Sequence, residues 1–193
     1  MVSVSGRTVL LGALLCSFPL SAWSANLLLN GAFNKPTTGV PAGTTVSFTG
    51  CLGAGNSAAA NWTMWINSCD SGFNDISATL VPSTLPGSTG YMQHIVTDGN
   101  RNGLVQASTF NQTSSLTSVW VYVNSGCVAV GTGTGGNTGQ DDTFCVPGKW
   151  FHIVNVPNGF SPATEIVIYS NNWIAGVNGA DFYVKNASVV VGH

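Results

Sequence analysis

The run Ser118-Val119-Trp120-Val121-Tyr122-Val123 decides the fold. Side chains in a β-strand point alternately to opposite faces, so the two aromatic residues share one face and the three valines share the other. One of the two faces must pack against a core, because a strand with two solvated faces would bury nothing. The period of two, without any helical period, predicts a strand here.

Comparable runs of β-branched and aromatic residues recur between clusters of turn residues such as Asp98-Gly99-Asn100. No window of useful length shows a helical period. Strands at this spacing predict an all-β fold, a single β-sandwich with jelly-roll connectivity. The Gly-rich stretch from Gly131 to Gly139 is expected to be a flexible loop. The predicted strands are Thr44–Phe48, Trp62–Ile66, Tyr91–Val96, Leu104–Phe110, Ser118–Val123, Phe151–Val156, Glu165–Tyr169 and Phe182–Val191.

The N-terminus has the layout of a secretory signal peptide: Arg7, an apolar run, and then small and polar residues up to Ser24. We expect cleavage before Ala25, so residues 1–24 are the signal peptide and residues 25–193 the mature domain. The apolar run is shorter than the roughly 20 residues that span a bilayer, which disfavours a membrane anchor. A lipoprotein signal at Cys16 is disfavoured by Leu15 before it. The predicted location is extracellular or periplasmic, with no membrane insertion after cleavage.

Four cysteines remain after cleavage, and an even number in an exported chain indicates two disulfides. Three pairings are formally possible. We favour the two local ones, each across a Gly- and Asn-rich segment, and each worth about 3 kcal/mol by loop entropy. A metal site is the alternative, but no CxxC or HxxxH spacing supports it. The favoured pairs are Cys51 with Cys69 and Cys127 with Cys145.

Both ends of the mature chain resemble secreted carbohydrate-binding modules with a galactose-binding-like jelly roll, the CenC-like type. The opening Asn26-Leu-Leu-Leu-Asn-Gly-Ala-Phe-Asn34 resembles their first strand, and Asp181-Phe-Tyr-Val-Lys-Asn-Ala-Ser-Val189 resembles their last. Trp62 and Gly148-Lys149-Trp150 match further positions. The resemblance implies a non-catalytic domain that binds a polysaccharide or another glycan.

The chain departs from that family where its members often hold a structural calcium ion, which needs carboxylate oxygens. Asn34 replaces an acid after the opening Phe, and Lys185 and Asn186 occupy the second acidic place. A lysine ammonium there would repel a cation or replace it. Calcium is therefore disfavoured and no cofactor is expected, with Asp181 the one acid left as a ligand.

Composition disfavours several other functions. Only 6% of residues are charged and the formal net charge is -2, so no basic patch exists to bind nucleic acid. Glycosidases need two carboxylates across the bond, whereas this chain has a single glutamate, Glu165. The adjacent pair Asp141-Asp142 is interpreted as a solvated part of a Gly-rich loop. It is not expected to be a catalytic pair, because the side chains of sequence neighbours would point apart in a strand. The histidines lie in no nucleophile motif.

The composition best suits the binding of a neutral glycan, because aromatic rings stack on sugar rings while amides and hydroxyls hydrogen-bond to the sugar hydroxyls. Trp173 is the first candidate, because Asn171-Asn172-Trp173 begins a loop. For the strand aromatics, packing in the core is the competing interpretation. An adhesive or structural jelly-roll protein and a small polysaccharide-degrading enzyme are the alternative functions, and the oligomeric state stays open. The candidate ligand-binding residues are Trp173, Trp65, Tyr122, Tyr91, Trp120, Asn172, Gln93 and Arg101.

Overall fold

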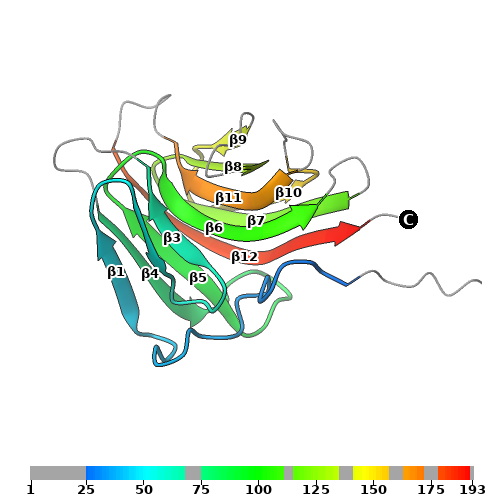
Figure 1. The fold of residues 1–193 in the computed structure, drawn as a ribbon, viewed down its shortest axis with the longest axis horizontal. Helices are drawn as coiled ribbons and strands as arrows, with labels where there is room; N and C mark the ends of the chain where they lie inside the picture. Colours follow the sequence, from blue (N-terminus) through cyan, green and yellow to red (C-terminus); the bar gives the residue numbers. More distant parts are fainter. Residues whose placement is uncertain are drawn as a thin grey trace, which may run out of the picture.

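The protein is a β-sandwich of the jelly-roll type, described by a computed structural model (Figure 1). The structure describes residues 25–67, 75–110, 115–134, 141–156, 163–171 and 178–191. No helix in these ranges has the length and apolarity that a membrane crossing requires. The predicted signal peptide, residues 1–24, lies outside the described residues.

Within the described ranges, twelve strands form two sheets of six, and every pairing is antiparallel. Sheet I has the order β1-β4-β5-β12-β7-β10 and sheet II the order β2-β3-β6-β11-β8-β9. The strands are β1 Thr45–Thr49, β2 Gly53–Asn56, β3 Thr63–Ile66, β4 Asp75–Pro82, β5 Tyr91–Thr97, β6 Asn102–Phe110, β7 Ser115–Ser125, β8 Val128–Gly133, β9 Asp141–Phe144, β10 Lys149–Val154, β11 Ala163–Ser170 and β12 Ala180–Val191.

The alternation in β7 has the predicted outcome. Val119, Val121 and Val123 are fully buried between the sheets, whereas Trp120 and Tyr122 point outward and are partly exposed. The same rule holds in β3, where Met64 and Ile66 enter the core with the preceding Trp62. Each sheet thus contributes one face to a shared core and leaves the other face available.

Trp62 anchors the end of the core that lies next to the chain's opening segment. Its ring stacks on Phe33 with 4.7 Å between ring centroids, and its Nε1 donates to the carbonyl oxygen of Asn30 at 3.3 Å. Both rings are buried. Trp62 is therefore a core residue.

The opening segment differs from the strand that the resemblance implied. It makes one isolated bridge, between Asn26 and Val190, and then turns. Two backbone bonds still tie it to β12: the Leu27 amide donates to Val189 and the Ala187 amide donates to Gly31, both at 2.8 Å. A Cβ at Gly31 would lie 2.1 Å from the Ala187 carbonyl oxygen, so this close approach requires glycine. The opening and closing segments, which carry the resemblance, thus lie side by side.

Four strands were missed by the sequence analysis, namely β2, β4, β8 and β9. The prediction of a flexible loop is wrong for the first residues of that stretch, because Gly131 and Gly133 belong to β8 and are buried there. The loop assignment of Asp141-Asp142 is also wrong, because both lie in β9. Local propensity failed at these positions because glycine and aspartate disfavour strands in isolation, whereas here the ladder bonds of neighbouring strands hold them.

The disulfide between Cys127 and Cys145 is confirmed, with 4.2 Å between the two Cα atoms. It joins the residue before β8 to the residue after β9, and so closes the hairpin at the edge of sheet II. Cys51 is disulfide-bonded as well. Its expected partner Cys69 lies outside the described residues.

Replacing both Cys127 and Cys145 by serine is expected to lower the free energy of unfolding by about 3 kcal/mol, from the loop entropy of an 18-residue separation. The midpoint of thermal unfolding would fall by roughly 6–12 °C for a chain of this size. Circular dichroism measures this shift. Val146→Ser, at an exposed neighbour in the chain, is the control and should change the midpoint little. A double variant as stable as the control would contradict the prediction.

Candidate functional site

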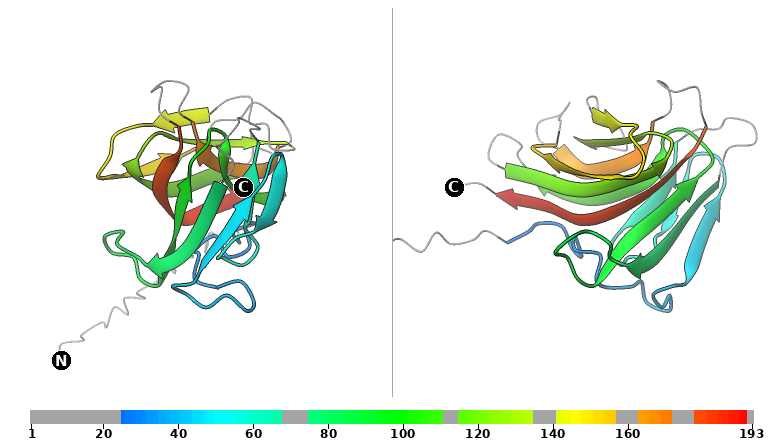
Figure 2. Two further views of the ribbon diagram at one scale, coloured as in Figure 1. Left: turned by 90° about the vertical axis from the view of Figure 1, so that its left-hand side faces the viewer. Right: turned by 180° about the vertical axis from the view of Figure 1, so that it is seen from behind.

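The two halves of the outer face of sheet I carry different side chains. On β1 and β4 the outward residues are small and hydroxylated, as in Thr45, Ser47, Ser77 and Thr79, which is ordinary for a solvated sheet. On β5, β12, β7 and β10 several outward positions carry rings instead. Figure 2 (right) shows sheet I in front. We call this half the Tyr122 face, made of His94, Tyr183, Trp120, Tyr122, Trp150 and His152.

Strand register places four of these rings in one row across the sheet. His94 pairs with Tyr183, Tyr183 with Tyr122, and Tyr122 with Trp150. Residues directly opposite on antiparallel strands have Cβ atoms about 4.5–5.5 Å apart, so their rings are in contact. The row exists because outward positions of four separate strands come into the same register.

The rings differ in orientation. His94 stacks on Tyr183 at 4.4 Å with an angle of 15° between ring planes, and Trp120 stacks on His152 at 4.2 Å with an angle of 4°. These distances match the spacing of neighbouring strands, about 4.8 Å, so the stacked rings stand upright on the sheet. Tyr122 is turned by 68° from Tyr183 and by 59° from Trp150. No ring stacks in parallel on Tyr122 among these neighbours.

Polar groups border the row of rings at Asp181. His94 Nε2 lies 2.7 Å from Asp181 Oδ1, and Asn124 Nδ2 donates to Asp181 Oδ2 at 2.8 Å. About a quarter of the His94 and Asp181 side chains is exposed, so the pair is open to solvent. Burial, followed by the charge of Asp181, raises the pKa of Tyr183, which keeps this phenol neutral and able to donate a hydrogen bond.

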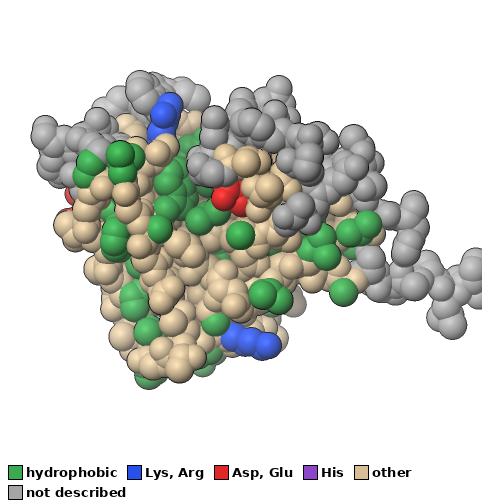
Figure 3. Space-filling model, viewed as in Figure 1, with side chains coloured by type: hydrophobic (Ala, Val, Ile, Leu, Met, Phe, Trp, Pro, Cys, Tyr) green, Lys and Arg blue, Asp and Glu red, His purple; other side chains and the backbone are tan. Residues whose placement is uncertain are grey.

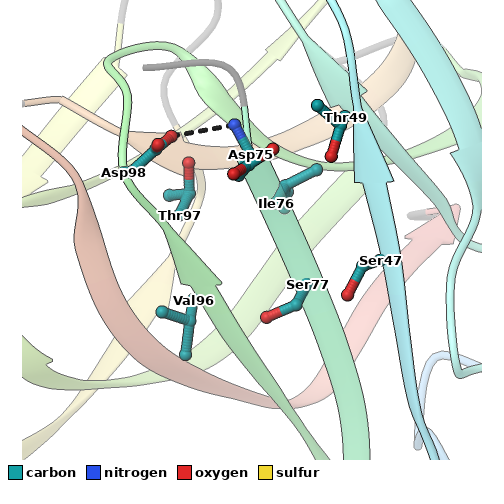
Figure 4. Close-up of a pocket in the computed structure, with 8 residues that line it drawn as sticks. All are labelled: Ser47, Thr49, Asp75, Ile76, Ser77, Val96, Thr97 and Asp98. Carbon is teal, nitrogen blue, oxygen red and sulfur yellow. Dashed lines mark hydrogen bonds between the residues drawn. The ribbon is translucent and has the colours of Figure 1, made fainter. Parts of the chain in front are cut away.

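A groove of about 310 Å³ adjoins the same outer face over β1, β4 and β5 (Figure 4). The Asp75 amide donates to Asp98 Oδ1 at 2.8 Å and closes one end. Val96, which is 41% exposed, lies at the side nearest the rings, because it pairs with Asp181 in the strand register. The groove is lined by Ser47, Thr49, Asp75, Ile76, Ser77, Val96, Thr97 and Asp98.

The outer face of sheet II holds a second, more buried group of aromatic and polar side chains. Trp65 and Tyr169 lie 6.1 Å apart, and each is only 8% exposed. The Tyr169 hydroxyl donates to Asp141, which also accepts from the Thr143 hydroxyl at 3.2 Å. The buried Trp65 Nε1 has no hydrogen-bond partner among the residues that the structure describes. Figure 3 views this side of the molecule and shows acidic side chains among hydrophobic ones.

The predicted ligand-binding residues are distributed over both faces, the core and the loops. Trp120 and Tyr122 come together on the Tyr122 face, whereas Trp65 lies on the opposite sheet. Gln93 does not reach either outer face, because it is fully buried and donates to Ser57 Oγ. Tyr91 has the same inward direction and packs against the core.

The remaining predicted residues lie in turns and loops. Arg101 is exposed in the turn between β5 and β6, with a positive φ of 58°. Asn172 and Trp173 lie outside the described residues. The sequence analysis missed Tyr183 and Trp150 as site residues. Alternation along β12 and β10 would have placed them outward, but only strand pairing places them beside Tyr122.

The Lys185 side chain is buried, with its ammonium surrounded by oxygen atoms. Nζ donates to the carbonyl oxygens of Ala32 at 2.8 Å and Tyr91 at 2.5 Å, and to Asn34 Oδ1 at 3.2 Å. Burial lowers the pKa of this lysine. Asp181, the acid considered for calcium, contacts His94 and Asn124 instead. Within the described ranges no three His, Cys, Asp or Glu side chains are grouped to hold a metal ion.

No family model and no curated protein matches this chain. Solved structures similar to it include TmCBM61 in complex with β-1,4-galactotriose, at 12% identity and a TM-score of 0.48, covering 87% of this chain and 99% of that one. A family 29 carbohydrate-binding module mutant complexed with cellulohexaose has 11% identity and a TM-score of 0.42, covering 77% and 93%.

A third similar structure is the CBM22-1–GH10 part of xylanase 10B from Clostridium thermocellum, complexed with xylohexaose. The identity is 13% and the TM-score 0.41, and the match covers 61% of this chain. It spans only 25% of the xylanase chain.

Proposed function

We propose that this protein is a non-catalytic carbohydrate-binding domain, and that it holds a neutral glycan on the Tyr122 face. The observation that carries the proposal is the row His94, Tyr183, Tyr122 and Trp150, at outward positions where the other half of the same sheet has serine and threonine. A cluster of partly exposed aromatic residues on the outer face of a small domain is typical of an interaction surface.

The chemistry of the face suits a sugar. A pyranose has an apolar face that packs on an aromatic ring and a rim of hydroxyls that need hydrogen bonds. Tyr122 supplies a ring on which neither Tyr183 nor Trp150 stacks in parallel. Asp181 and Asn124 are hydrogen-bonded to each other, but the carboxylate can accept and the amide can donate a further hydrogen bond beside the ring. Few charges on the chain favour a neutral ligand.

Hydrolysis is disfavoured at this face. Cleavage of a glycoside generally requires two carboxyl groups on either side of the bond. Asp181 is the carboxylate next to the rings, and both of its oxygens already have partners, His94 and Asn124. The engagement of Asp181 by His94 and Asn124 supports binding without cleavage.

The Cys127–Cys145 disulfide supports a location outside the reducing cytosol. It agrees in this respect with the predicted signal peptide. Secretion into an extracellular or periplasmic space is therefore part of the proposal.

The double variant Tyr122→Ala/Trp150→Ala is expected to weaken glycan binding at least tenfold, because each lost ring contact is worth about 0.5–1.5 kcal/mol beyond its buried area. Isothermal titration calorimetry with cellohexaose, xylohexaose and β-1,4-galactotriose measures the effect on the mature protein. The unfolding midpoint should change little, since both rings are partly exposed. Val154→Ser, an exposed outward change on β10, is the matched control.

Other results would redirect the assignment. If Trp65→Ala removes binding while the double variant binds normally, the site lies on sheet II and the proposal for the Tyr122 face is wrong. Release of reducing sugar would contradict a non-catalytic role. Absence of binding to all three glycans, together with self-association that Tyr122→Ala abolishes, would favour the structural or adhesive alternative.

A further inference from the structure

The groove over β1, β4 and β5 is separated from the rings of the Tyr122 face only by Val96 and the residues beside it. We propose that this groove is a second sugar subsite, which receives the continuation of the glycan chain stacked on Tyr122. The ligand is then an extended chain bound along its length, rather than a terminal sugar. This inference rests on the proposed function of the Tyr122 face.

Strand register makes the two parts continuous. Ser47 pairs with Ser77, Ser77 with Val96, and Val96 with Asp181. This row runs across β1, β4, β5 and β12, next to the row that contains His94 and Tyr183. Side chains along it are small or of moderate size, so no bulky residue of the row stands between groove and rings. A chain that leaves Tyr122 past Asp181 meets Val96 and then the groove.

The groove lining has the chemistry of a site for sugar hydroxyls. Ser47, Thr49 and Ser77 present hydroxyl groups that both donate and accept. Asp75 and Asp98 add carboxylate acceptors, and Val96 adds an apolar contact for a sugar ring. Figure 4 shows these side chains over neighbouring strands.

The charge of the groove selects among glycans. Among the described residues that line it are two aspartates and no lysine, arginine or histidine. Asp181 lies on the path between the groove and Tyr122. The carboxylates of Asp75 and Asp98 would repel the acidic groups of uronic or sulfated sugars, because like charges repel. The class of ligand is therefore a neutral polysaccharide.

The size of the surface requires a chain of several sugars. Neighbouring strands lie about 4.8 Å apart, so the five spacings from β10 to β1 span roughly 24 Å. A trisaccharide seated on Tyr122 and Trp150 would leave the groove empty. A hexasaccharide would reach it. Binding strength should therefore increase with chain length until the groove is filled.

Filling the groove by Ser77→Leu tests this inference. The probes are β-1,4-linked gluco-, xylo- and galacto-oligosaccharides of three and six units, titrated calorimetrically into the mature protein. Wild type should bind the hexasaccharide of its preferred series about tenfold more tightly than the trisaccharide. Ser77→Leu should abolish this difference and leave trisaccharide affinity unchanged. Thr45→Leu, an exposed change on the same outer face but outside the groove lining, is the control.

The outcomes separate this inference from the proposed function. Equal affinity for three and six units, or a normal hexasaccharide affinity in Ser77→Leu, overturns the groove subsite while the Tyr122 face stands. Normal binding of both lengths by Tyr122→Ala/Trp150→Ala overturns the proposed function itself, and absence of any binding overturns both. A changed elution volume for Ser77→Leu in gel filtration would instead assign the groove to contact between copies of the chain.

Discussion

Trp62→Ala is expected to lower the free energy of unfolding by about 3–5 kcal/mol, the usual cost of removing a buried tryptophan. The ring is 2% exposed and stacks on Phe33, and alanine would leave a cavity between the two sheets. The Asn30 carbonyl would also lose the indole donor. The unfolding midpoint should fall by roughly 6–20 °C in calorimetry or circular dichroism.

The matched control is Trp120→Ala, which removes the same side chain from a partly exposed position. Its midpoint should fall much less than that of Trp62→Ala. Should Trp62→Ala fail to fold, Trp62→Phe retains the stacking partner and is expected to cost about 1–3 kcal/mol, the range for imperfect repacking. Equal midpoints for the two alanine variants would contradict the core position of Trp62.

Lys185→Met is expected to destabilise the protein by about 3 kcal/mol, because each buried oxygen left without a donor costs about 1–3 kcal/mol. Methionine has a similar length but no donor. The oxygens of Ala32, Tyr91 and Asn34 would then lose the ammonium that they share. Chemical denaturation measures the change in the free energy of unfolding.

Lys35→Met is the control, because Lys35 is exposed. It should leave the free energy of unfolding nearly unchanged. We also propose that the Lys185 ammonium supplies the positive charge that a structural calcium ion would otherwise bring. The midpoint of the wild type should therefore be the same in EDTA and in CaCl₂. A calcium-dependent rise, or a Lys185→Met variant as stable as the control, would contradict this role.

Strands with alternating apolar residues could be predicted from the sequence. In β7 the valines and the aromatic residues lie on opposite sides of the sheet, as the period of the backbone alone predicts, and the valines contact the core. β4 carries the same signal at Ile76, Ala78 and Leu80 and was nevertheless missed. β8 could not be predicted in this way, because its glycines carry no side chain from which a period could be counted.

The candidate ligand-binding residues could be predicted only in part from the sequence. Trp120 and Tyr122 were predicted as a pair because they are two residues apart on one strand. Gln93 was chosen for its amide, but the register of β5 turns it into the core, where it contacts Ser57. The facing of a polar residue depends on which side of its strand the core lies, and propensity does not contain that information.

The sequence by itself was enough to predict a β-sandwich with the Cys127–Cys145 disulfide. The strands follow from alternation within short windows, and the two cysteines lie only 18 residues apart. The tertiary structure alone assembled Tyr122, Tyr183 and Trp150 into one row, because they lie on three strands joined only by long-range ladders. It also placed the hydroxyl groove beside that row and Lys185 among its oxygens. Contacts between distant strands depend on sheet order and register, which no short window of sequence encodes.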